Sequence, residues 1–171
     1  MARTGNGRDN TRARIDARGR VSIPRVYRDS LGLDRGKKVV ILKDFNREGC
    51  LVVYNFEKWK AIEEEMERRL NPADRRKKRL FRWILSGMTI TEVDDMGRIL
   101  LPGGLMNYAN LKDEAYFQYF PGFLEIWNPE KFETVGLGTE EEFPDEEIMD
   151  LFDIKGEKGD KHERDTQASN G

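Results

Sequence analysis

Apolar and polar positions alternate over short stretches of this chain, and one such stretch occurs twice. Val21 and Ile23 flank Ser22, and the same spacing returns at Ile99 and Leu101. Alternation of this kind predicts a half-buried strand. Each stretch ends in a proline, which cannot donate a ladder hydrogen bond but suits the first turn of a helix. Each copy therefore predicts a strand, a turn, a second strand and a short helix.

The two copies also share a turn signal. The first reads Ile-Asp-Ala-Arg-Gly-Arg-Val-Ser-Ile-Pro over residues 15–24, and the second reads Val-Asp-Asp-Met-Gly-Arg-Ile-Leu-Leu-Pro over residues 93–102. An aspartate can accept backbone N–H groups two residues on, and glycine supplies positive φ without steric cost. We predict that each aspartate caps its turn and holds the following arginine. The predicted structural residues of the turns are Asp16, Gly19, Asp94 and Gly97.

Apolar runs after each copy predict a pair of strands joined by a loop. In the first copy these runs are Lys38–Lys43 and Cys50–Tyr54, and in the second they are Ala115–Tyr119 and Phe123–Trp127. Runs of this length, rich in β-branched and aromatic residues and bounded by glycine or proline, are typical of hairpins. The same order of elements is thus expected on both sides of the chain's centre.

Two helices are predicted between the copies. Asn55 is a good N-cap for the first, whose apolar side chains recur at helical spacing. The second is expected to begin at Asn71-Pro72 and to run to about Ser86. Glutamates of the first helix and arginines of the second are expected to face each other across an antiparallel hairpin or to solvate its surface. A second nucleic-acid patch on the arginine-rich helix is the alternative.

Charge is distributed unevenly although the net charge is only −2. Residues 1–28 carry eight arginines against two acids, and residues 139–171 carry twelve acids against four lysines and arginines. Such asymmetry favours a basic surface for a polyanion and an acidic tail. The tail could also act as an internal decoy that competes with DNA for the arginines. We expect disorder beyond Lys155.

The side chains needed for catalysis are scarce. The chain has one cysteine, Cys50, and one histidine, His162, which falls in the acidic tail. It contains no phosphate-binding loop of the P-loop kind. Asp94 and Asp95 could form a metal or acid pair, but a turn aspartate beside an exposed neighbour explains them more simply. We therefore predict no enzymatic activity, no cofactor and no metal. The lone cysteine and the lack of a membrane-spanning apolar run favour the cytoplasm.

Arginine is concentrated in the first copy only. The second copy keeps Arg98 but has Glu92 at the position of Arg14 and Met96 at that of Arg18. A shared fold with one basic copy predicts that the first copy contacts a nucleic acid while the second completes the core or a subunit contact, although a merely soluble basic face is possible. The predicted DNA-binding residues are Arg12, Arg14, Arg18, Arg20, Arg25, Arg28 and Arg98.

These features resemble the MraZ family of bacterial transcriptional regulators, which carry two SpoVT/AbrB-type repeats. The paired Asp-x-x-Gly-Arg signatures carry the resemblance, together with Pro24 and Pro102, Asn71-Pro72 before an arginine-rich helix, and Leu124-Glu125-Ile126-Trp127. The match covers about residues 12–132. The polar arm before it, a longer segment between residues 79 and 94, and the acidic tail depart from the family pattern.

The resemblance implies an α+β, β-rich fold in which two swapped-hairpin repeats form one intertwined pseudo-dimeric unit. It also implies a ring-shaped homo-oligomer, an octamer or larger, associated with the nucleoid. Such a ring would bind direct repeats in double-stranded DNA upstream of its own division and cell-wall operon, with Arg20 as the DNA contact carried over from the family. The alternative is an antitoxin-like or scaffold module that binds protein without specific DNA binding.

The expected organisation has five parts. They are a flexible basic arm (residues 1–11), the first repeat (12–59), a helical connection (60–88), the second repeat (89–135) and an acidic, largely disordered tail (136–171).

Overall fold

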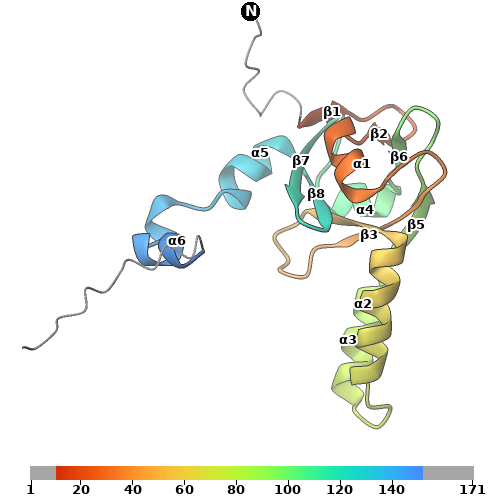
Figure 1. The fold of residues 1–171 in the computed structure, drawn as a ribbon, viewed down its shortest axis with the longest axis vertical. Coiled ribbons are helices and arrows are strands. Elements are labelled where there is room, and N and C mark those ends of the chain that lie inside the picture. Colours follow the sequence, from red (N-terminus) through yellow and green to blue (C-terminus); the bar gives the residue numbers. More distant parts are fainter. Residues whose placement is uncertain (1–10, 152–171) are drawn as a thin grey trace, which may run out of the picture. The chain divides into compact units, whose positions relative to one another are not determined.

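The computed structural model describes residues 11–151 (Figure 1). These residues fall into two compact units, one that ends at Leu137 and one that begins at Gly138. Each unit is described by itself below. The predicted flexible arm, apart from Thr11, the predicted disorder beyond Lys155, and His162 lie outside the described residues.

Both repeats have the predicted order of strand, turn, strand and short helix, followed by a hairpin. The first helix ends at Leu31, because Gly32 adopts the left-handed conformation that closes it. The elements of the first repeat are β1 (Arg12–Arg14), β2 (Arg20–Ser22), α1 (Arg25–Leu31), β3 (Lys38–Lys43) and β4 (Leu51–Asn55); those of the second are β5 (Thr89–Glu92), β6 (Arg98–Leu100), α4 (Gly103–Tyr108), β7 (Glu114–Phe120) and β8 (Phe123–Trp127).

The repeats exchange their first strands. One sheet has the order β1-β7-β8-β4-β3-β5, so β1 of the first repeat pairs with β7 of the second, and β5 of the second pairs with β3 of the first. The remaining strands β2 and β6 pair with each other as an antiparallel ribbon (Figure 1). The prediction of an intertwined, swapped-hairpin pseudo-dimer is confirmed.

One hydrophobic core serves both repeats. Val21 of β2 and Ile99 of β6 face inward and are at most 1% exposed, and they share a buried cluster with Phe117 and Leu124 of the β7–β8 hairpin. Each such side chain contributes roughly 1.5–3 kcal/mol on burial. Because the cluster draws on both repeats, neither repeat buries its apolar face alone.

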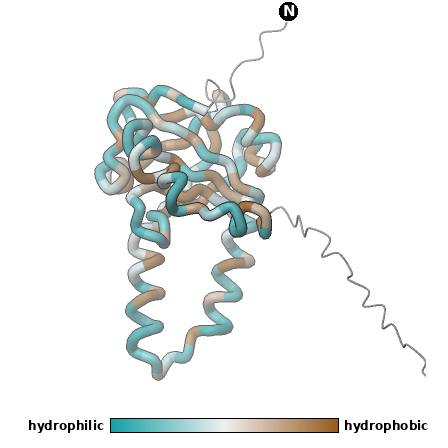
Figure 2. The backbone as a smooth tube through the Cα atoms, turned by 90° about the vertical axis from the view of Figure 1, so that its left-hand side faces the viewer, coloured by the Kyte–Doolittle hydropathy of each residue, from teal (hydrophilic) through white to brown (hydrophobic). Residues whose placement is uncertain are grey.

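A helical hairpin connects the repeats. It consists of α2 (Phe56–Arg69) and α3 (Arg75–Ser86), which run away from the sheet and converge at the loop between them (Figure 2). Asn55 caps α2 as predicted, since its Oδ1 accepts the N–H of Glu57 at 2.9 Å. Trp59 is buried under the sheet in a cluster with Val40 and Leu42.

The predicted start of α3 was wrong. Asp74, not Asn71, is the N-cap, because its Oδ1 accepts the N–H groups of Arg76 at 2.9 Å and Lys77 at 3.0 Å. Asn71 instead closes a separate turn by accepting the N–H of Ala73. Two side chains of similar capping power stand three residues apart, and the one nearer the helix caps it.

The charged side chains of the helical hairpin are exposed to solvent and do not pair across it. Within residues 11–151 no ion pair joins α2 to α3, and Glu65 pairs with Arg68 and Arg69 of its own helix. Of the two arrangements expected for these charges, only the solvated one occurs. Pairs of this kind, exposed and three or four residues apart, add little to stability.

The last part of the first unit is a short α5 (Pro129–Lys131) that continues into a π-helical turn, η1 (Phe132–Gly136). Phe132 stacks on Tyr116 with ring centroids 4.0 Å apart and meets Trp127 edge-on, so this turn is anchored on the sheet. The second unit contains η2 (Glu140–Glu142) and α6 (Asp145–Leu151). The tail was expected to be largely disordered, but η2 and α6 make it partly helical up to Leu151. In residues 11–151 no helix has the length and apolar character needed to cross a membrane.

The first prediction concerns Gly19, which combines a φ of +80° with a close approach to the backbone. A Cβ at Gly19 would lie 2.8 Å from the carbonyl oxygen of Leu101, whereas a Cβ at Gly36, where φ is +76°, would meet nothing within 4 Å. Gly36→Ala should therefore cost about 1–2 kcal/mol for the left-handed backbone alone. Gly19→Ala should cost roughly a further 1–3 kcal/mol because the neighbouring strand must shift. Urea unfolding at a single protein concentration measures the free energy of unfolding of each variant. Equal losses of stability for Gly19→Ala and Gly36→Ala would contradict the close approach at Gly19.

Candidate nucleic-acid interface

The first signature turn is built around one carboxylate. Asp16 Oδ1 accepts the backbone N–H groups of Arg18 at 2.9 Å and Arg20 at 3.0 Å, and its Oδ2 accepts Nε of Arg20 at 2.7 Å. Gly19 donates its N–H to the Asp16 carbonyl at 2.9 Å. The turn therefore orders its own backbone and fixes the direction in which the Arg20 side chain leaves the strand.

The second turn repeats this geometry. Asp94 Oδ1 accepts the N–H groups of Met96 and Arg98, each at 2.9 Å, and its Oδ2 accepts Nε of Arg98 at 2.8 Å. The predicted capping by both aspartates is confirmed in these contacts. Asp94 is a turn residue, and Asp95 beside it pairs with Arg35 rather than with a metal or a second acid.

The two turns meet across the ribbon. Arg98 Nη1 lies 4.0 Å from Asp16 Oδ2, the same oxygen that holds Arg20. The Gly19 carbonyl accepts the N–H of Leu101 at 2.8 Å, and the Gly97 carbonyl accepts the N–H of Ile23 at 3.0 Å. Each turn is thereby fastened to the end of the other repeat's strand. The sequence carried no signal for these bonds, because they join residues that only the fold brings together.

The β2–β6 ribbon has one inward and one outward face. Arg20 pairs with Leu100 and Ser22 pairs with Arg98, and all four positions alternate with the buried Val21 and Ile99. Successive side chains of a strand point to opposite faces. The structure therefore brings Arg20 and Arg98, the two signature arginines, to the outer face of one ribbon.

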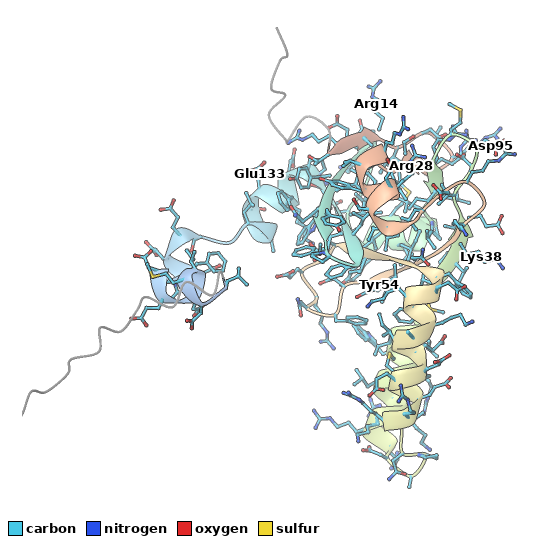
Figure 3. All side chains as sticks on the ribbon, in the orientation of Figure 1. Arg14, Arg28, Lys38, Tyr54, Asp95 and Glu133 are labelled. Carbon is cyan, nitrogen blue, oxygen red and sulfur yellow. The ribbon has the colours of Figure 1, made fainter. Side chains whose placement is uncertain are left out.

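Four further arginines are exposed on the first repeat. Arg18 is at the tip of the first turn, and Arg12 and Arg14 flank Ala13, which packs on the core. Figure 3 shows Arg14 projecting from the body of the first unit into open space. Arg25, at the start of α1, has a side chain that is 86% exposed and only a 3.8 Å contact with Asp29. All of these guanidinium groups are open to an external anion.

Arg28 differs from the others. Its Nε donates to the Ile23 carbonyl at 3.1 Å, and its guanidinium lies over Gly97, where any Cβ would collide with it. In the second repeat the side chain of Met106 lies over Gly19 in the same way. Although Arg28 was predicted as a DNA contact, its geometry is that of a side chain which locks the second turn against the first helix.

The turn carboxylates are tuned to stay charged. The backbone N–H of Arg20, and then the guanidinium of Arg20 and the N–H of Arg18, outweigh partial burial and hold the pKa of Asp16 below its ordinary value of 3.8. Partial burial acts to raise the pKa of Asp94, but hydrogen bonds from Arg98 and Met96 outweigh it and the net shift is also downward. Each carboxylate thus remains an ion-pair partner at neutral pH.

Other groups in the described part of the chain do not form a reactive centre. Burial raises the pKa of the Cys50 thiol, with further upward effects from Asp44 and Glu125, so this cysteine is an unreactive part of the core. Across residues 11–151 no three His, Cys, Asp or Glu side chains gather as ligands of a metal would.

The lowered pKa of the turn carboxylates predicts a specific acid sensitivity. A carboxyl group whose pKa is lower in the folded than in the unfolded chain stabilises the fold above the unfolded value of about 4, and this contribution is lost as the pH falls through the folded pKa. The double variant Asp16→Asn and Asp94→Asn should be less stable than the wild type at pH 7 and should lose less stability between pH ~5 and pH ~3. Thermal unfolding across this pH range measures how the stability of each variant depends on pH. Asp29→Asn is the control and should keep the wild-type profile. Parallel curves for the wild type and the double variant would contradict the assigned role.

Comparison with known proteins agrees with this geometry. The family model described as "MraZ protein, putative antitoxin-like" matches residues 8–80 and 84–148, which extends beyond residues 12–132 on both sides. A protein of Caldanaerobacter subterraneus subsp. tengcongensis named "Transcriptional regulator MraZ" is 35% identical over 82% of this chain and 94% of its own length. Proteins of the same name from Thermoanaerobacter sp. (strain X514) and Legionella pneumophila (strain Corby) are each 36% identical, over 81% and 70% of this chain and 91% and 78% of their own lengths. These relatives carry the name of a regulator and not of an enzyme, and the chain belongs to the MraZ family.

Proposed function

We propose that this protein is a sequence-specific DNA-binding transcriptional regulator. The observation that carries the proposal is the β2–β6 ribbon, whose outer face presents Arg20 and Arg98 at fixed angles. The major groove of B-DNA admits a two-stranded ribbon, and an arginine can bind guanine O6 and N7 there with two hydrogen bonds. Because Asp16 and Asp94 hold the Nε atoms, the terminal Nη groups are the ones available to DNA.

The surrounding arginines extend this surface to the phosphates. Arg18 at the turn tip is placed to approach the groove, and Arg12, Arg14 and Arg25 are exposed beside it. Phosphate contacts supply affinity and register, whereas contacts to base edges supply specificity. Arg28 contributes by holding the two repeats in place rather than by touching DNA.

The names of the relatives support the same function. The curated relatives are called transcriptional regulators, and the chain covers most of the length of the first two compared above. We extend the resemblance to the target and propose direct repeats upstream of the protein's own division and cell-wall operon. A regulator of this kind acts in the cytoplasm, in association with the nucleoid.

A ring-shaped homo-oligomer, an octamer or larger, is part of the proposal. One protomer offers a single small basic face, and a ring presents several such faces to spaced DNA boxes, which raises avidity without new contacts. Apolar side chains on α3 are available for assembly, since Leu80 is 56% exposed and Trp83 is 36% exposed. Clusters of exposed apolar groups commonly mark contacts between proteins.

The test of DNA binding is the substitution Arg18→Met. Methionine already occupies the equivalent position of the second turn, at Met96, so the turn should fold unchanged. We expect Arg18→Met to weaken binding by about 1–3 kcal/mol or, if Arg18 binds a phosphate, to make the log–log salt slope less negative by about one unit. The wild type should show a slope near −3 to −4 if about four arginines bind phosphate. Fluorescence anisotropy on DNA from upstream of the gene, beside scrambled DNA, measures both the binding affinity and the salt slope.

Arg68→Met on α2 is the matched control, because Arg68 is equally exposed but lies on the helical hairpin. It should leave affinity and slope unchanged. If Arg18→Met and Arg20→Ala also leave them unchanged, or if the wild type does not distinguish scrambled DNA, the antitoxin-like or scaffold alternative replaces the regulator.

The oligomer has its own test. A closed ring should give one mass that does not grow with protein concentration, because every copy has both of its contacts filled. Light scattering at several concentrations, checked by native mass spectrometry, should show a plateau at an octamer or a larger closed number. A mass that rises steadily with concentration, or a monomer throughout, would contradict a ring.

A further inference from the structure

An apolar groove runs between the two helices of the hairpin. Its volume is about 340 Å³, its floor is formed by Met66, Leu70, Leu80 and Phe81, and Arg69 and Lys77 stand at its rim. Figure 2 shows that α2 and α3 diverge from the loop between them toward the sheet. A groove of this chemistry suits an amphipathic helix laid along it.

The rim of the groove is strongly basic. Helix α3 carries six lysines and arginines between Arg75 and Arg82 and no acid. Within residues 11–151 no ion pair joins α3 to α2, and the carboxylate of Glu65 is held by Arg68 and Arg69 of α2 itself. The occupant of the groove should therefore be apolar on one face and acidic on the other.

The second unit of the chain has this composition. Residues 138–151 contain seven acids and no lysine or arginine. On α6 the exposed apolar residues Ile148 and Leu151, three positions apart, share one helical face, while Glu146 and Asp150 lie on the opposite one. The seven residues of α6 span about 10 Å at 1.5 Å per residue, which is about the length of α3 from Lys77 to Ile84 beside the groove.

We propose that α6 of one protomer docks in the α2–α3 groove of a second copy of this chain. The inference rests on the proposed oligomer and names its contact. Ile148 and Leu151 cover the floor of the groove, and the acids of residues 140–150 meet the basic rim. Such a contact uses different surfaces on the two partners, and repeated head-to-tail contacts of this type close into rings. The acidic segment thus serves assembly.

The experiment is disulfide crosslinking between two variants of the full chain. One chain carries Leu80→Cys in the groove, and the other carries Ile148→Cys on α6 and a tag that changes its size. Cys50 does not interfere, because it is buried. After co-expression and mild oxidation, a mixed dimer should form on a non-reducing gel. Asn107→Cys, exposed on α4, replaces Leu80→Cys as the matched control and should give only background.

A second arm tests the charge of the rim. Lys77→Glu, added to the Leu80→Cys chain, should reduce the mixed dimer to the control level. Lys60→Glu, on α2 but outside the residues that line the groove, should leave it unchanged. Loss of the mixed dimer with both substitutions would mean that net charge and not the groove is responsible, which would overturn the proposal.

The remaining outcomes are equally decisive. No mixed dimer, or an intrachain disulfide when both cysteines are placed in one chain, would overturn docking on a second copy. The native oligomer masses of the reduced samples show whether only the α6 contact is wrong or the proposed oligomer is wrong as well. A closed oligomer without the crosslink refutes only the α6 contact, whereas a monomeric wild type removes the proposed assembly and the contact together.

Discussion

Strand exchange is the constraint on which the rest of the structure depends. The N–H and C=O groups of β1 find partners on β7, and those of β5 find partners on β3, so each repeat's first strand is paired by the other repeat. Buried backbone groups without partners are costly, and a single repeat would leave both an open edge and an uncovered apolar face. Carrying both repeats on one chain makes the exchange intramolecular. The strand exchange therefore does not weaken when the protein is diluted. In an obligate dimer, by contrast, stability depends on protein concentration.

Within this frame, the same turn serves two purposes. Asp16 and Asp94 make equivalent hydrogen bonds, so the backbones of the two turns match. The differences in charge lie mainly at outward positions, such as Arg18 against Met96, whereas buried differences, such as Val21 against Ile99, stay apolar. Positions that pack were kept apolar while exposed positions diverged. A basic face can therefore be confined to one repeat at little cost to folding, because exposed substitutions rarely change stability by more than about 0.5 kcal/mol.

Local chemistry made much of this structure predictable. The turn aspartates, the strands and the cap at Asn55 follow from interactions within a few residues, and the doubled signature indicated the exchange of strands through the family resemblance. Features that depend on distant partners were not predictable. The packing of Arg28 over Gly97 requires the two repeats to be superposed, and the open groove of the helical hairpin reflects side chains that find no partner within the first unit. The wrong start of α3 was a local choice between Asn71 and Asp74, and nothing in the sequence ranked them.

The pairing of β2 with β6 relates the two repeats by an approximate two-fold axis, but the arginines do not obey it. A true symmetric dimer presents the same surface twice in opposite orientations and is matched to a palindrome. Here the first repeat carries most of the arginines while the second keeps only Arg98 of the signature set, so the proposed DNA-binding surface has a polarity. Protomers that follow one another around a ring keep that polarity if each is turned by the same rotation. The broken symmetry of a single chain is thus enough to favour operator boxes that all point the same way.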